Sequence, residues 1–194
     1  MVFAPGYTFA DYPRGRYSLQ TIEQQIEAFH NAYRVWQLDI ALNIVQQKDT
    51  GFAVLGILNP YIEMIARHWL GYTSEEAKGK TKYLYCEGVR LMFPSLESNK
   101  SIYEQVGKIL YESTRCSVAH LGLTGSGIHL SETEYEYPLN IHIGADNSVA
   151  LLGIHPRLWA EAISDHFEEY VAVLRNVEEA DRRAAFSRCF LGSI

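Results

Sequence analysis

Apolar residues recur at alternating steps of four and three along much of the chain, which is the spacing that places side chains on one face of an α-helix. The first such run starts after Ser18 and ends near Gln47, with Ser18 or Thr21 as the expected capping residue. Its apolar positions are Ile22, Ile26, Phe29, Tyr33, Trp36, Ile40 and Ile44. We therefore expect one long amphipathic helix at the start of the fold.

Two further helices are expected in the first half of the chain. Residues 51–71 repeat the helical pattern, and Pro60 within them is expected to kink or restart the helix because proline lacks a backbone N–H. Residues 80–93 form the next candidate, which should stop before Pro94 because the residue preceding a proline disfavours helical geometry.

Both ends of a fourth helix are marked by local signals. Ser101-Ile-Tyr-Glu104 matches a capping box, and Gly122 is a typical residue beyond a helix end. Pro156 stands where a first-turn proline belongs, so a fifth helix is expected from there to Leu174. A last short helix is predicted over residues 178–189.

Strand-like alternation occurs only between the fourth and fifth predicted helices. Leu139 to Ile143 and Val149 to Ile154 are expected to pair as a β-hairpin around a turn at residues 144–147. The turn is expected at the surface, at the edge of the bundle. Residues 1–17 mix proline, glycine and aromatic residues and are expected to form an irregular arm. These are the only elements expected outside the helices.

Length and composition favour a single domain over residues 1–194. The chain has 194 residues, of which 47% are hydrophobic and 21% charged, and no linker-like stretch divides it. We expect a mainly α protein: an antiparallel helical bundle with the hairpin of residues 139–154 inserted, and a C-terminal tail helix within residues 177–194.

Charge and cysteine content limit the binding partners, the kinds of site and the cell compartment that we expect. The formal net charge of -6 disfavours binding of duplex DNA through a broad basic face. Cys86, Cys116 and Cys189 are odd in number and widely spaced, so neither a disulfide framework nor a zinc site is indicated. Charged and polar residues interrupt the apolar stretch 52–70, and the N-terminus lacks a secretory pattern, so we expect a cytoplasmic protein without a membrane span.

The segment Tyr111 to His120, YESTRCSVAH, is the candidate for chemistry, because four residues separate Arg115 from His120 at the end of a predicted helix. This motif in a helical chain resembles the HEPN superfamily (higher eukaryote and prokaryote nucleotide-binding domains) over roughly residues 18–175. The resemblance implies a metal-independent endoribonuclease with Arg115 and His120 as catalytic residues, or a member that binds without cleaving. Active members usually carry a polar residue directly after the arginine, whereas this chain has Cys116.

The spacing of Arg115 and His120 also predicts a homodimer. Five positions rotate about 140° around an ideal α-helix, so the two side chains do not share a face within one chain. Two copies with antiparallel motif helices would instead combine the arginine of one subunit with the histidine of the other. A histidine in the last helical turn can transfer protons near neutral pH, and a guanidinium suits a phosphate. Tyr111 and Ser117 are the candidate substrate-binding residues, and neither cofactor nor metal is required.

Several alternatives remain open at the level of sequence. In one of them Arg115 simply pairs with Glu112 while His120 caps the helix, and Tyr111 belongs to the core. Four histidines invite a metal site but match no ligand spacing, with His142 expected in solvent and His155 next to the proline-started helix; they are His129, His142, His155 and His166. Basic residues that could meet phosphates are more simply solvated charge; they are Lys78, Lys80, Lys82, Arg182, Arg183 and Arg188.

Three functions follow from these interpretations. The first is an RNA-cleaving homodimer, with an antitoxin or a nucleotidyltransferase as a further expected partner. The second is a catalytically silent HEPN-like dimer that binds a nucleotide, RNA or a protein. The third is a purely structural or regulatory dimer.

Overall fold

The computed structural model describes residues 2–4, 7–8, 21–116 and 125–192. These residues are mainly helical and include a small three-stranded sheet, which confirms the expected mainly α character. The first predicted helix is present as α1 (Ile22–Tyr33), a π-helical turn (Arg34–Leu38) and α2 (Asp39–Ile44), which follow one another without a break. Thr21 caps α1 in a capping box with Gln24.

Helix α3 (Gly51–Leu70) runs through Pro60, so of the kink or restart expected there, the restart is wrong. Packing on both sides stabilises the helix: Leu58, Tyr61 and Ile62 around the proline are all buried. The helix ends at Gly71, whose φ of 71° lies in the left-handed region that favours glycine.

The following helices cross α3. After the short α4 (Ser74–Ala77) comes α5 (Thr81–Met92), close to the predicted range, and then a 3₁₀ turn (Pro94–Ser98). Helix α6 (Lys100–Leu110) starts earlier than predicted, because Asn99 and not Ser101 caps it: the Asn99 Oδ1 accepts from the N–H of Ile102 at 3.2 Å. The helix therefore begins at Asn99 rather than at Ser101, and the predicted capping box does not form.

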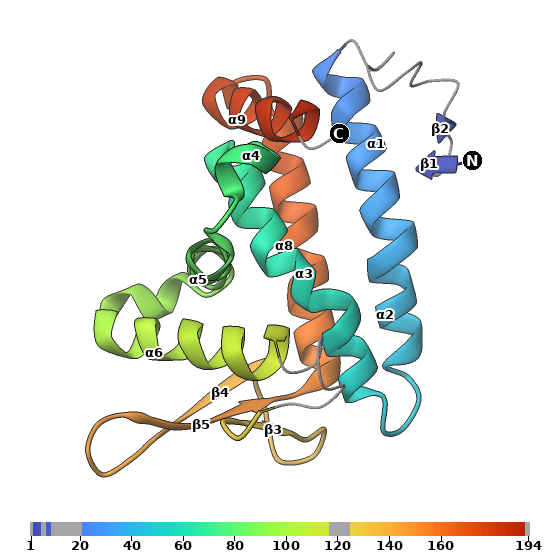
Figure 1. Ribbon diagram of the computed structural model, residues 1–194. Coiled ribbons are helices and arrows are strands. Elements are labelled where there is room, and N and C mark those ends of the chain that lie inside the picture. The colour runs from blue at the N-terminus through green and yellow to red at the C-terminus, as the bar shows by residue number, and fades with distance from the viewer. Residues whose placement is uncertain (1, 5–6, 9–20, 117–124, 193–194) are drawn as a thin grey trace.

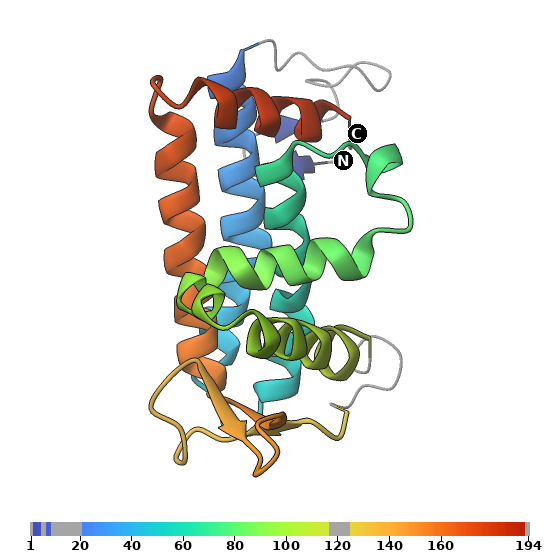
Figure 2. The ribbon, with the colours of Figure 1, turned by 90° about the vertical axis from the view of Figure 1, so that its left-hand side faces the viewer.

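The C-terminal part follows the prediction closely. Helix α8 (Pro156–Arg175) has Pro156 in its first turn and His155 as its N-cap, with Nδ1 accepting from the N–H of Leu158. Helix α9 (Ala180–Leu191) is the expected last helix. It lies across one end of the molecule, against α3 and α8 (Figures 1 and 2).

The sheet contains one more strand than predicted. The expected hairpin forms between β4 (Leu139–Ile143) and β5 (Val149–Ile154), with the residues of its turn mostly exposed. A third strand, β3 (Ile128–Leu130), pairs in parallel with β5, so β5 is central in the order β3-β5-β4. Its three residues are too few to show alternation in the sequence.

The N-terminal segment also contains paired strands. Within the described part of residues 1–17, β1 (Val2–Ala4) and β2 (Tyr7–Thr8) form an antiparallel pair, so the irregular arm expected there is corrected for these residues.

The long helices form one layer and the shorter ones cross it. The segment α1–α2, α3 and α8 lie side by side along the molecule, α5 and α6 run across them, and the sheet closes the end opposite α9 (Figures 1 and 2). The core between them is rich in aromatic residues; its largest fully buried side chains include Trp159, Tyr61, Tyr85, Phe167 and Phe186. In the described part of the chain, none of the helices has the length and apolar character needed to cross a membrane.

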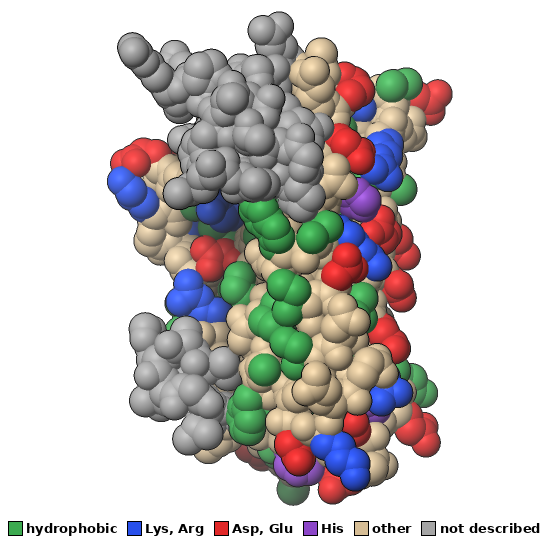
Figure 3. All heavy atoms as spheres, turned by 90° about the vertical axis from the view of Figure 1, so that its right-hand side faces the viewer, with side chains coloured by type: hydrophobic (Ala, Val, Ile, Leu, Met, Phe, Trp, Pro, Cys, Tyr) green, Lys and Arg blue, Asp and Glu red, His purple; other side chains and the backbone are tan. Residues whose placement is uncertain are grey.

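One face of the long-helix layer exposes apolar side chains. Figure 3 shows hydrophobic groups following the face that α1 and α2 present to solvent. Val35, Trp36 and Ile40 belong to this segment, and each is more than 40% exposed. Trp36 and Ile40 continue the helical period of the sequence, but the period alone did not show that this part of the stripe remains uncovered.

Candidate functional site

Arg115 is held by a π-helical turn, Tyr111–Cys116, that continues α6. The buried Thr114 explains the departure from α geometry, since its hydroxyl donates to the carbonyl of Leu110 at 2.5 Å. In an α-helix that carbonyl accepts the N–H of residue 114, so a side chain that takes this place disturbs the ladder. π-Helical turns are rare in proteins as a whole, and those that occur are often found at functional sites.

The π turn changes the geometric basis of the predicted dimer. The 140° separation of Arg115 and His120 assumed ideal α-helical rotation through residue 120, and this is wrong for residues 111–116. His120 and Ser117 lie outside the described residues. The composite arrangement of Arg115 and His120 in two subunits therefore stays a prediction.

The ion pairs around Arg115 differ from the alternative in which Arg115 pairs with Glu112. Glu112 accepts from Lys82 Nζ at 2.9 Å, and this contact lowers the pKa of Glu112. Arg115 instead has Nη2 3.5 Å from Oε2 of Glu63 on α3. The predicted pair between Arg115 and Glu112 is thus replaced by a contact between two distant parts of the sequence, which turns the guanidinium toward α3.

Arg115 and Glu63 line a cavity of about 510 Å³ between α3 and the π turn. Its volume falls within the usual range of small-molecule sites, about 300–1,000 Å³. Arg67 adds a second guanidinium, while Pro60 and Met64 supply apolar wall. Two cationic side chains and one carboxylate leave the cavity with a positive balance, although the chain as a whole is acidic.

A buried asparagine lines the same cavity. Asn59 is 3% exposed, and its Oδ1 lies 3.4 Å from the hydroxyl of Tyr85, which also contacts Thr114 Oγ1 at 3.1 Å. The Tyr85 hydroxyl has one proton to donate, so it cannot donate to both neighbours. Within the described part of the chain, Asn59 Nδ2 has no hydrogen-bond partner. A buried unsatisfied amide costs about 1–3 kcal/mol and calls for a reason.

Pro60 adds an acceptor to this wall. Because proline has no N–H, the carbonyl of Gly56 lacks its α-helical donor, and Gly56 also lines the cavity. The arrangement therefore offers hydrogen-bond donors from Arg115 and Arg67 beside acceptors from Glu63 and the Gly56 carbonyl. Gly56, Asn59, Glu63 and Arg67 were not selected from the sequence; their spacing of three and four was the only local signal.

Tyr111 and Cys116 lie next to each other at the two ends of the π turn. The Tyr111 ring packs edge-on against Tyr85 with centroids 5.6 Å apart, and Tyr111 lines the edge of the core. Burial and a hydrogen bond with the Cys116 thiol raise the pKa of Tyr111. Tyr111 was considered both as a substrate-binding residue and as a core residue. Its contacts in the structure are those of a residue packed against the core.

The histidines considered as metal ligands have other surroundings. His142 is exposed, as predicted, and its ring and that of His129 flank Tyr135 on the sheet. His166 Nδ1 lies 2.5 Å from the hydroxyl of the buried Tyr61, and burial lowers the pKa of His166. Among the residues the structure describes, no group of three or more histidine, cysteine or acidic side chains is arranged to hold a metal ion.

The basic residues near the C-terminus have structural contacts. Arg182 donates to the carbonyl of Trp69, Arg183 to that of Leu174, and Arg188 to that of Gly71. These carbonyls stand at the C-terminal ends of α3 and α8, where helices leave acceptors unpaired. The three arginines fasten α9 to the ends of two long helices.

The lysines have separate partners. Lys78 pairs with Glu75, and Lys80 lies over the ring of Tyr72.

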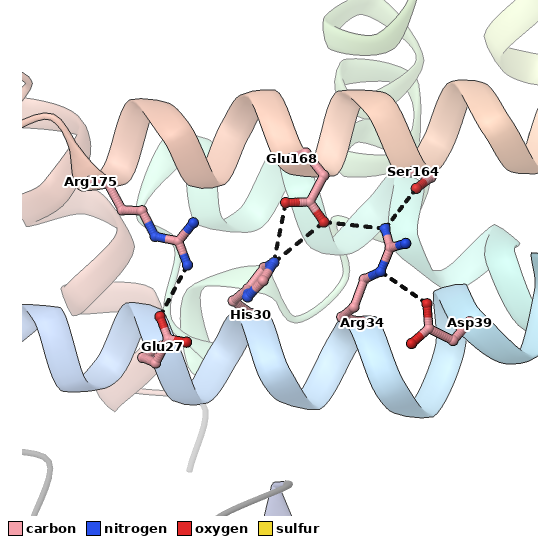
Figure 4. A network of polar contacts seen from close by, with 7 residues as sticks. All are labelled: Glu27, His30, Arg34, Asp39, Ser164, Glu168 and Arg175. Carbon is pink, nitrogen blue, oxygen red and sulfur yellow. Dashed lines mark hydrogen bonds and ion pairs between the residues drawn. The ribbon is translucent and has the colours of Figure 1, made fainter.

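A polar network between the α1–α2 segment and α8 was also missed from the sequence (Figure 4). Glu168 contacts His30 Nε2 at 3.2 Å and Arg34 Nη1 at 3.2 Å, and Arg34 also donates to Ser164 and pairs with Asp39. Arg175 pairs with Glu27 one step along the same seam. The network joins the first long helix to α8 and does not line the Arg115 cavity.

Comparisons of the chain with protein-family models, with curated proteins and with solved structures found no match.

Proposed function

We propose that the protein binds a phosphate-bearing ribonucleotide, as part of RNA or as a free nucleotide, in the cavity at Arg115. The observation that carries this proposal is the placement of two guanidinium groups, those of Arg115 and Arg67, on one cavity of ligand size. Guanidinium groups match the oxygens of phosphate with parallel N–H donors. In this proposal the fold is an antiparallel HEPN-like bundle, the protein is cytoplasmic, and it acts as a homodimer.

Cleavage of RNA without a metal is the second candidate. Its support is that the side chain of Arg115 is 36% exposed, so a phosphate outside the cavity can reach it. His120 of a second copy would accept the proton of the 2′-hydroxyl, whose oxygen then bonds to the adjacent phosphorus as the bond to the 5′-oxygen breaks. Arg115 would stabilise the negative charge that grows on the phosphate, and the 5′-oxygen would leave with a proton. The contact of Arg115 with Glu63 and the presence of Cys116 after the arginine favour binding without cleavage.

The binding proposal is tested by titrating the full chain with inorganic phosphate, single nucleotides and a short single-stranded RNA. Arg115→Ala should weaken binding at least tenfold, whereas Arg157→Ala, which removes an exposed arginine on α8, should change it less than twofold. Equal losses in both variants would indicate non-specific charge attraction. A preference for RNA over nucleotides, or the reverse, identifies the source of the phosphate.

The cleavage candidate is tested with a fluorogenic RNA in excess EDTA. Appearance of a cyclic phosphate end, lost in Arg115→Ala, supports catalysis. Binding of RNA without cleavage would instead support the catalytically silent HEPN-like protein. Sedimentation at micromolar concentration tests the dimer, and a stable monomer would remove the composite site while leaving the cavity as a binding site.

A further inference from the structure

The donors and acceptors of the Arg115 cavity point to a particular ligand. A bare phosphate or carboxylate satisfies only the guanidinium groups of Arg115 and Arg67. It leaves Glu63 and the carbonyl of Gly56, which lacks its helical donor because of Pro60, facing a group that cannot donate to them. The occupant should therefore carry N–H or O–H donors as well as an anionic group.

Guanine is the RNA base whose donors fit a carboxylate. Its Watson–Crick edge presents N1–H and the N2 amino group side by side, and a carboxylate has two oxygens that accept a parallel pair of donors. Adenine and cytosine present one amino donor next to an acceptor nitrogen, and uracil presents one N–H between two carbonyls. Among the four base edges, only that of guanine can engage both oxygens of Glu63 through adjacent N–H donors.

We propose that the cavity binds a guanine nucleotide, with the base edge on Glu63 and the phosphate on Arg115. This inference rests on the proposed phosphate site. The separation of 3.5 Å between Arg115 Nη2 and Glu63 Oε2 is longer than a normal hydrogen bond, so either group can turn to a ligand. Pro60 and Met64 give the base an apolar wall.

The test measures binding of GMP, AMP, CMP, UMP and guanosine to the full chain by calorimetry. GMP should bind at least tenfold more tightly than the other nucleotides, because a matched bidentate pair discriminates at that level. Glu63→Gln should bring GMP to within about twofold of AMP, since an amide presents one donor and one acceptor. Glu161→Gln, the same change at an exposed site on α8, should leave the preference intact. Thermal melting checks that both variants fold.

The outcomes separate this inference from the phosphate proposal. Equal binding of all four nucleotides that still depends on Arg115 would overturn the guanine assignment and leave the phosphate site standing. Binding of guanosine as tight as GMP, unaffected by Arg115→Ala, would support the base site and overturn the role of Arg115. If neither nucleotides nor phosphate bind at millimolar concentration, both proposals fail.

Discussion

The guanidinium of Arg115 lies 3.5 Å from the carboxylate of Glu63, although 51 residues separate the two positions in the sequence. Their side chains are 36% and 21% exposed, so water screens the pair and its contribution to stability is small, about 1 kcal/mol or less. The ion pair matters for binding, because the carboxylate of Glu63 competes with any anion for Arg115.

Glu63→Gln should therefore increase the affinity for inorganic phosphate. The expected gain is up to about fivefold at low salt, since half-exposed ion pairs contribute at most about 1 kcal/mol. It should shrink as ionic strength rises. Calorimetry with phosphate at two salt concentrations measures it, with Glu161→Gln as the matched control. A loss of phosphate affinity in Glu63→Gln would mean that the carboxylate positions Arg115 and does not compete with the ligand.

If the protein cleaves RNA, His120→Ala should reduce the rate about 10²- to 10⁴-fold, the usual contribution of a positioned acid or base. Arg115→Lys should restore little of the activity lost in Arg115→Ala, because an ammonium lacks the two-pronged donor geometry of guanidinium. Cys116→Asn, which restores a polar residue after the arginine, should maintain or raise the rate. Cleavage that survives His120→Ala, or that requires added divalent metal, would place the chemistry elsewhere.

His68 should make the stability of the protein depend on pH. It is buried between Phe29 and Phe186 and hydrogen-bonded to the carbonyl of Met64, and burial lowers the pKa of His68 to about 4. The unfolded chain takes up the proton near pH 6.5, before the folded one. The stabilisation is complete above that pH and is lost as pH falls to about 4, by roughly 3 kcal/mol in total.

Urea unfolding of the wild type and of His68→Phe at pH 7.5, 5.5 and 4.5 measures this loss. Other titrating groups cancel in the difference between the two proteins, so the gap in unfolding free energy should move in favour of His68→Phe as pH falls. Parallel curves would show that His68 does not titrate in this range.

Gly88→Ala should destabilise the fold by about 3 kcal/mol or more. A Cβ at Gly88 on α5 would stand 1.8 Å from the carbonyl oxygen of Ile62 on α3, and a helix backbone cannot give way locally. Gly107→Ala is the matched change, because its Cβ would meet the end of the Cys86 side chain at 2.9 Å, which can turn aside. Urea unfolding compares the two, and equal losses would contradict the close approach of α5 and α3.

Local patterns along the chain determined most of the helices and the hairpin. The periodicity from Ile22 to Ile44, the first-turn proline of α8 and the alternation of β4 and β5 each depend on neighbours within a few residues. The extra strand β3 escaped prediction because its pairing partner β5 is about 20 residues away. The restart expected at Pro60 is wrong because the packing of α3, and not the proline, decides whether the helix continues.

The sequence by itself determined that His120 follows Arg115 after four residues, and its pattern predicted that both stand near the end of a helix, which suggested a phosphate site. Only the tertiary structure decided what faces Arg115. Glu63, Asn59 and Arg67 reach the cavity from α3, and the contact of α3 with the π turn depends on packing across the whole helical layer. Such contacts are set by burial between elements far apart in the sequence, which no spacing of residues along the chain reveals.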